Sequence, residues 1–192
     1  MEIAILVIGL LYSIVLHELA HGYVAEKLGD YTPRYAGRLT LNPLAHLDPI
    51  GSFLVPLLTY LAGGFLIGLA KPVPINPYNF EKPDRDMALV AMAGPLTNIV
   101  IALILASFYK VFYFNGILLE PLLPLIRLNL LLAVFNLIPI PPLDGSRVFL
   151  RNLDPQTMIF LEQFGLLFIF LFIYIAFPFL NSIVNFLFNL LI

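Results

Sequence analysis

The stretch His17-Glu18-Leu19-Ala20-His21 lies inside an apolar run, Ile3–Lys27, that is long enough to cross a membrane as one helix. Residues four apart share one face of a helix, so His17 and His21 can bind one metal ion together. Glu18, beside the first histidine, is placed to take a proton from a water at that metal. A chance match would be the better interpretation in a soluble helix. Ionisable side chains are costly at membrane depth, however, so here the cluster indicates a functional site.

The composition is that of an integral membrane protein. Of the 192 residues, 60% are hydrophobic and only 11% are charged, whereas soluble domains have roughly 45–50% apolar and about 25% charged residues. The lipid bilayer is therefore a partner of the chain, and a net charge of -2 gives no indication of nucleic-acid binding. The chain has no cysteine, which leaves His, Asp and Glu as metal ligands.

We expect one all-α membrane domain over residues 1–192, with about four transmembrane helices. Four apolar stretches approach or exceed the length of about 20 residues that a span needs: Ile3–Lys27, Met87–Phe112, Leu118–Leu137 and Met158–Phe177. A fifth stretch, Ile50–Leu69, is interrupted by Pro56 and by two adjacent glycines. The tail, Phe179–Ile192, is too short to span alone and follows Pro178, so we expect a C-terminal helix at the membrane interface.

The order of these segments predicts a re-entrant hairpin. Suppose that Asp144, which follows the third long stretch, joins the two histidines near the end of the first stretch. The third stretch must then end on the side of the membrane toward which the first one runs. Met87–Phe112 must begin on that same side. Both loops around Ile50–Leu69 would lie on that face, so this segment should enter and leave by one side, shielded by protein or water.

The basic residues predict which side of the membrane this face adjoins. Eight of the ten lysines and arginines fall in loops on the side of the membrane toward which the first stretch runs, which we call the active face. Only Lys110 and Arg127 fall on the other side. Loops rich in Lys and Arg stay in the cytoplasm. We therefore expect a multi-pass protein of the cell membrane with its active site toward the cytoplasm.

Two loop segments could form a small β-sheet at the membrane surface. Tyr35–Leu41 alternates enough between polar and apolar residues to suggest a strand. Lys71–Pro77 should be extended, because its prolines exclude helix. For the second segment, an irregular proline-rich loop is an equally good interpretation.

A third metal ligand is required, because catalytic zinc has three protein ligands and an open fourth position. Asp144 is the candidate, since it follows a proline-rich break in an apolar helix and precedes Gly145. An Asp-Gly pair is also a common turn signal, and from these two residues alone the turn is the better interpretation.

Three motifs together resemble the site-2 protease family of intramembrane zinc metalloproteases. They are His17-Glu18-Leu19-Ala20-His21-Gly22, Ala93-Gly94-Pro95-Leu96-Thr97-Asn98 and Asn136-Leu137-Ile138-Pro139 followed by Leu143-Asp144-Gly145. The loop Asn42–Gly51 resembles that of the minimal prokaryotic branch without a PDZ or nucleotide-binding domain.

The resemblance implies one Zn²⁺ per chain, bound by His17, His21 and Asp144. It implies that Glu18 is the general base and that Asn136 helps to stabilise the oxyanion of the tetrahedral intermediate. The implied substrates are transmembrane proteins, such as membrane-tethered regulators that are cut in regulated intramembrane proteolysis.

Several alternatives remain open. His46, the third histidine, could bind the metal, position substrate or cap its loop, and the usual ligand count argues against the first role. For Asn98 a hydrogen bond between helices is the preferred explanation, while Gly94-Pro95 can kink its helix and allow close packing. The main alternative function is a membrane metal transporter that uses the same histidines and Asp144. A transporter needs access from both faces, and no second polar cluster lies toward the outer side.

Overall fold

The computed structural model describes residues 2–47, 71–114 and 119–192, and these residues form helices and irregular loops. The elements are α1 (Glu2–Lys27), α2 (Thr32–Tyr35), the 3-10 helices η1 (Pro43–His46) and η3 (Pro77–Asn79), α4 (Pro83–Phe114), α5 (Leu122–Asn136), α6 (Asp144–Phe149) and α7 (Pro155–Leu191). The expected all-helical class is confirmed.

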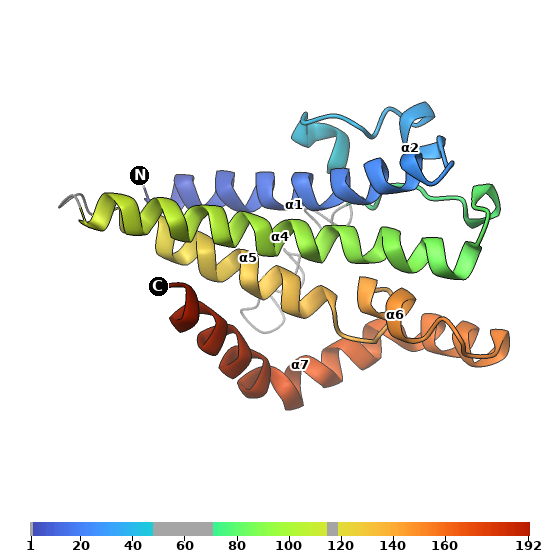
Figure 1. Ribbon diagram of the computed structural model, residues 1–192. Coiled ribbons are helices and arrows are strands. Elements are labelled where there is room, and N and C mark those ends of the chain that lie inside the picture. The colour runs from blue at the N-terminus through green and yellow to red at the C-terminus, as the bar shows by residue number, and fades with distance from the viewer. Residues whose placement is uncertain (1, 48–70, 115–118) are drawn as a thin grey trace.

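Helices α1, α4 and α5 lie side by side, and α7 runs along the far side of α5 (Figure 1). Helices α1 and α5 run toward the end of the molecule that carries α2 and α6, while α4 and α7 run back from it. A core cluster joins α4, α5 and α7 through Ala102, Ala106, Ile126, Leu130 and Val184. The two alanines of α4 let the neighbouring helices approach closely, as small residues do in membrane bundles.

Three helical segments are long and apolar enough to cross a membrane: Ala4–Lys27, Pro83–Phe114 and Gln156–Leu191. The expected fourth span is shorter than predicted. Helix α5 has 15 residues, or about 22 Å at 1.5 Å per residue, against a hydrocarbon core of about 30 Å. It begins directly after Pro121, and proline is favoured at the start of a helix, where its missing N–H is not needed.

The tail is not the separate C-terminal helix that the sequence predicts after Pro178, and its expected place at the membrane interface stays a prediction. Helix α7 continues through Pro178 to Leu191, and it bends part-way along its length (Figure 1). A proline inside a helix removes one backbone hydrogen bond and kinks the helix. The bend turns the tail toward the bundle, where Leu180 and Val184 are buried. The tail therefore contacts the core through these two residues, while Phe179, Phe186 and Leu190 stay exposed.

The small β-sheet is not found in the described residues, so the strand prediction for Tyr35–Leu41 is wrong. Tyr35 ends helix α2, and Gly37 turns the chain with a φ of 66°. The irregular segment Lys71–Asn76 contains Pro72 and Pro74, which lack the N–H group that a β-ladder requires. The predicted hairpin Ile50–Leu69 lies outside the described residues.

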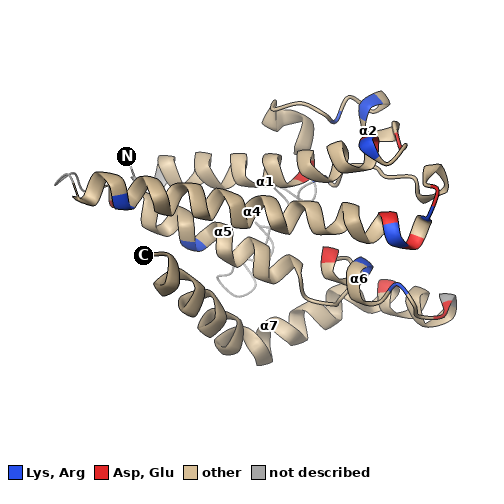
Figure 2. Ribbon diagram, in the orientation of Figure 1, with Lys and Arg blue, Asp and Glu red and all other residues tan. Residues whose placement is uncertain are grey.

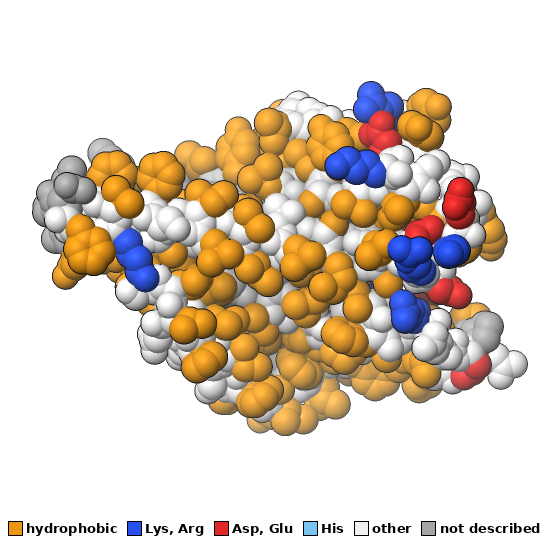
Figure 3. Space-filling model, viewed as in Figure 1, with side chains coloured by type: hydrophobic (Ala, Val, Ile, Leu, Met, Phe, Trp, Pro, Cys, Tyr) orange, Lys and Arg blue, Asp and Glu red, His pale blue; other side chains and the backbone are white. Residues whose placement is uncertain are grey.

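Charged side chains gather at the end of the molecule that carries α2, α6 and the start of α4 (Figure 2). In the space-filling view, hydrophobic side chains cover most of the surface between the two ends (Figure 3). The chain therefore has one charged end, and the last turns of α1 lie close to it.

Candidate metal centre

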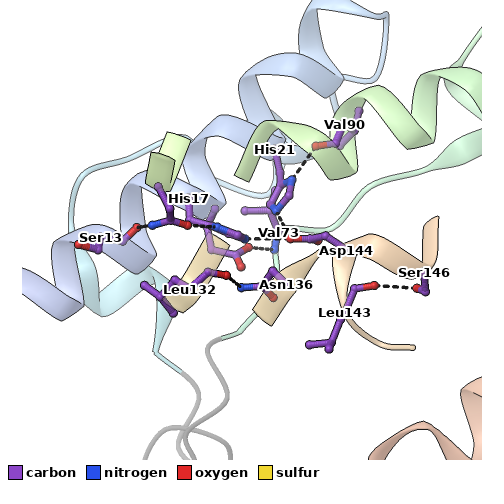
Figure 4. Close-up of polar contacts among 12 residues, drawn as sticks. Ser13, His17, His21, Val73, Val90, Leu132, Asn136, Leu143, Asp144 and Ser146 are labelled. Atoms are coloured by element: carbon purple, nitrogen blue, oxygen red, sulfur yellow. Dashed lines mark hydrogen bonds and ion pairs between the residues drawn. The ribbon is translucent and has the colours of Figure 1, made fainter. Parts of the chain in front are cut away.

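The two histidines of α1 and the first residue of α6 converge on one point (Figure 4). Asp144 Oδ2 lies 3.1 Å from His17 Nε2 and 3.3 Å from His21 Nε2. The ligand atoms of all three residues lie within 4.8 Å of one another. The structure thus brings together side chains that are more than 120 residues apart in the sequence.

The separations of Asp144 Oδ2 from the two imidazoles fit a tetrahedral zinc ion. With zinc–ligand distances of about 2.0–2.1 Å, two ligands of a tetrahedral site lie roughly 3.3 Å apart. Both imidazoles are buried, at 7% exposure for His17 and 6% for His21. Two neutral imidazoles and one carboxylate also form a donor set that zinc prefers. The residues present therefore suit this metal.

Helix α4 orients both imidazoles through their other ring nitrogens. His17 Nδ1 lies 2.6 Å from Asn98 Oδ1, and His21 Nδ1 lies 2.7 Å from the carbonyl oxygen of Val90. Both partners are oxygen acceptors, so each Nδ1 carries the proton and donates it. Metal-binding histidines commonly use their second nitrogen in this way. Each Nε2 faces Asp144 and is the ring nitrogen available to the metal.

Gly94 lets α4 approach the two rings. A Cβ atom at this position would lie 2.5 Å from His17 Nε2 and 2.5 Å from His21 Nε2, whereas ordinary contacts are about 3.5–4.0 Å. The close packing expected for Gly94-Pro95 is therefore confirmed, and its partner is the histidine pair. Only a residue without a side chain fits at this point.

Asp144 is held at the start of α6, directly after the proline-rich turn that follows α5. A Cβ at Gly145 would collide with the backbone carbonyl of Leu137, so this glycine allows α6 to begin against the end of α5. Burial raises the pKa of the Asp144 carboxyl, but hydrogen bonds from His17 and His21 outweigh burial and lower it to about 2. The side chain is therefore a carboxylate, the form that binds a cation.

Glu18 and Asn136, the two predicted catalytic side chains, have partners next to this cluster. Glu18 Oε2 accepts a hydrogen bond of 2.8 Å from the backbone N–H of Val73. Asn136 Nδ2 donates to the carbonyl of Leu132 at 2.9 Å, one turn back in α5, and lies near the same group of side chains in Figure 4.

Curated relatives agree with a zinc-binding site. The chain is 40% identical over 197 residues to the Bacillus subtilis protein named "Putative zinc metalloprotease YwhC", covering 92% of this chain and 86% of the relative. The chain belongs to the site-2 protease family. It is also 32% identical over 155 residues to "Putative zinc metalloprotease Rip2" of Mycolicibacterium smegmatis, covering 80% of this chain and 59% of the relative. A third relative, "Putative zinc metalloprotease MJ0611" of Methanocaldococcus jannaschii, is 30% identical over 141 residues, with 72% and 65% covered.

No family model and no solved structure matches the chain. The relatives nevertheless show a zinc metalloprotease, and therefore a hydrolase with zinc as its cofactor. The three long apolar helices place this site-2 protease in a lipid bilayer.

The third histidine of this site-2 protease lies outside the cluster of metal-competent side chains found among the described residues. His46 is 2% exposed, and its Nε2 donates to the carbonyl of Thr40 at 2.9 Å. Its own carbonyl accepts a hydrogen bond of 3.0 Å from Lys71 N–H. These contacts favour the role of capping a loop.

Two polar residues at this site were missed by the sequence analysis. Asn129 of α5 and Ser13 of α1 are 0% and 4% exposed, and they form a hydrogen-bonded group with Asn98. The signal that could have found Asn129 is a polar side chain within an apolar helix, which is costly unless it has a partner. The preferred explanation for Asn98, a hydrogen bond between helices, is confirmed but incomplete, because Asn98 also orients His17.

Proposed function

We propose that this protein is an intramembrane zinc endopeptidase that cleaves peptide bonds in or near transmembrane segments of membrane proteins. In this proposal His17, His21 and Asp144 bind one zinc ion, and residues 1–192 act as a single catalytic domain. The observation that carries the proposal is the convergence of Asp144 with two imidazoles that belong to the candidate span Ala4–Lys27. A hydrolytic site built on a membrane helix suits a substrate that is itself in the membrane.

Glu18 acts as the general base and later as the general acid. When bound, zinc lowers the pKa of a coordinated water and polarises the carbonyl that is to be attacked. Glu18 accepts the proton of the attacking water at a carboxylate oxygen and returns it to the nitrogen of the leaving amine. The N–H of Val73 holds the Oε2 atom of Glu18, which keeps the carboxylate in one orientation.

Asn136 donates a hydrogen bond to the oxyanion. One of its two amide hydrogens is used by the carbonyl of Leu132, so the second is the one that serves this role. A preorganised donor of this kind favours the transition state over the ground state, because negative charge develops on the oxygen only as the bond forms.

The substrate must present extended backbone, because the carbonyls of a helix are already hydrogen-bonded and enclosed. A transmembrane helix therefore has to unwind before it is cut, and membrane-tethered regulators are the expected class. Eight of the ten basic residues belong to the end that carries α2 and α6. By the positive-inside rule this end faces the cytoplasm of the cell.

The test is Glu18→Gln in purified protein, with a transmembrane reporter as substrate in detergent. We expect cleavage to be lost while zinc content stays at one ion per chain, because Gln cannot accept the proton but leaves the three ligands unchanged. Glu81→Gln, which alters an exposed carboxylate, is the matched control and should cleave normally. Turnover retained by Glu18→Gln would exclude the proposed base. Zinc flux in proteoliposomes that survives this substitution would indicate transport instead.

A further inference from the structure

A chain of buried polar side chains leads from the metal centre into the helix bundle. We infer that Asn129 and Ser13 are positioning residues that act on His17 through Asn98, by selecting which ring nitrogen of His17 faces the metal. The inference deepens the proposed function and rests on it, since it takes His17 to be a zinc ligand.

The hydrogen-bonded side chains come from all three core helices, α1, α4 and α5. Asn98 of α4 offers its Oδ1 to His17 Nδ1 at 2.6 Å, and its Nδ2 donates to Asn129 Oδ1 of α5 at 3.0 Å. Asn129 Nδ2 in turn donates to Ser13 Oγ of α1 at 3.0 Å. Asn98 and Asn129 are 0% exposed and Ser13 is 4% exposed. Water therefore has no access to replace any of these contacts.

Two backbone carbonyls determine which groups donate and which accept at the end of this hydrogen-bond series that is farthest from His17. Ser13 donates its hydroxyl hydrogen to the carbonyl of Gly9 at 2.8 Å, so its oxygen can only accept from Asn129. Asn129 Nδ2 also donates to the carbonyl of Leu125 at 2.9 Å. A flipped Asn129 would turn its own oxygen toward both acceptors. The orientation of this amide thus follows from groups that cannot donate.

The orientation of the Asn129 amide determines that of Asn98, which in turn determines the hydrogen bond to His17. The Oδ1 of Asn129 is an acceptor, so Asn98 must present its NH2 group to it, and the carbonyl of Ser13 lies 3.5 Å from the same nitrogen. The Oδ1 of Asn98 then faces His17 Nδ1, which must carry the proton. Nε2 is then the ring nitrogen of His17 that faces the metal position beside Asp144. His21 needs no such chain, because a backbone carbonyl accepts its Nδ1–H directly.

A purely structural role predicts a different outcome from a positioning role. Polar contacts between membrane helices contribute little to stability on average, and leucine at position 129 would have nearly the shape of asparagine without its polarity. Asn129→Leu should therefore leave the bundle folded while it releases the amide of Asn98 to rotate. The change would act on the hydrogen bond that holds the His17 ring and on zinc affinity.

The first measurement is NMR of ¹⁵N-histidine-labelled, zinc-loaded protein in detergent. The chain has three histidines, which makes assignment practical. We expect the Nδ1–H of wild-type His17 to exchange slowly with water, and that of Asn129→Leu to exchange faster. With a competing chelator, zinc affinity of Asn129→Leu should fall about tenfold, the lower end for residues that orient metal ligands. Its melting temperature without metal should remain that of the wild type.

Ser13→Ala removes one of the two acceptors of Asn129 Nδ2 and should shift both readouts the same way by less. Ser107→Ala is its matched control, because Ser107 Oγ donates to the carbonyl of Leu103 at 2.8 Å on the exposed side of α4, and it should change neither readout. Unchanged Nδ1–H exchange with unchanged zinc affinity in Asn129→Leu would overturn the inference. So would a loss of zinc affinity that only follows a lower melting temperature. If Asn129→Leu does not fold, Ser13→Ala decides by the same criteria. Failure of the wild type to bind zinc would refute the proposed function and this inference with it, whereas wild-type zinc affinity in Asn129→Leu would refute the inference alone.

Discussion

Replacing Gly94 by alanine should destroy the metal centre while leaving most of the fold intact. The new Cβ would lie 2.5 Å from Nε2 of both His17 and His21. Ordinary contact distances are about 3.5 Å, so the rings would have to retreat by roughly 1 Å. Zinc–ligand distances vary by only about 0.2 Å. The rings therefore cannot yield and still bind the ion.

The expected loss of zinc binding is larger than the expected loss of folding stability. Removing a residue that only orients a ligand lowers zinc affinity by about 10–100-fold, so displacing two ligands directly should cost at least 100-fold, or about 2.7 kcal/mol. For folding, alanine is favoured over glycine inside a helix by roughly 0.5–1 kcal/mol, while overpacking costs about 1–3 kcal/mol. The metal-free protein should thus lose no more than about 2.5 kcal/mol of stability.

Zinc affinity measured with a competing chelator, beside thermal unfolding of the metal-free protein, tests this prediction. Gly9→Ala is the matched control, because its Cβ would meet only the flexible end of the Leu125 side chain in the contact between α1 and α5. The control should bind zinc like the wild type. Wild-type affinity in Gly94→Ala would show that the two imidazoles do not pack against α4 as the structure places them.

Two further predictions concern Asp30 and Asn136. Burial raises the pKa of the Asp30 carboxyl, but hydrogen bonds from Thr32, Asn76 and Asn79 outweigh it and hold the pKa below its usual value. A pKa lowered in the folded state stabilises the protein fully above the unfolded value of about 4 and is lost as the pH falls through the folded value. Asp30→Asn should therefore lower the melting temperature near neutral pH and flatten its decline in acid. The exposed variant Asp84→Asn should do neither. A melting temperature that depends on pH in Asp30→Asn as it does in the wild type would contradict this prediction. Asn136→Leu should lower kcat by about 10²–10³-fold with zinc content unchanged, and a kcat like that of the wild type would remove Asn136 from the mechanism.

The sequence predicted the helices best where apolar runs were long and bounded by charge or proline. The run Ile3–Lys27 was predicted almost to the residue. The tail was not, because Pro178 indicates a break only if nothing else stabilises the helix. Packing of Val184 against α4 and α5 supplies that stabilisation, and it depends on contacts between segments far apart in the chain.

The site, too, was predictable only where local geometry determines it. A spacing of four residues predicts that His17 and His21 share a face, because this follows from helix geometry alone. Asp144 could be assigned only through the family resemblance, since an Asp-Gly pair by itself favours a turn. The roles of Asn129 and Ser13 could not be predicted, because a polar side chain in an apolar helix indicates that it has a partner but not which one.

The geometry of α4 explains why its motif accompanies the two histidines. Val90, Gly94 and Asn98 are four residues apart, so they lie on one face of α4 just as His17 and His21 lie on one face of α1. The helices run in opposite directions, so the later residue, Asn98, holds the earlier histidine, and Val90 holds the later one. Gly94 sits between them against both rings. A shift of one residue in either helix would remove all three contacts at once. The register of α1 against α4 therefore determines the zinc geometry as directly as the ligands themselves do.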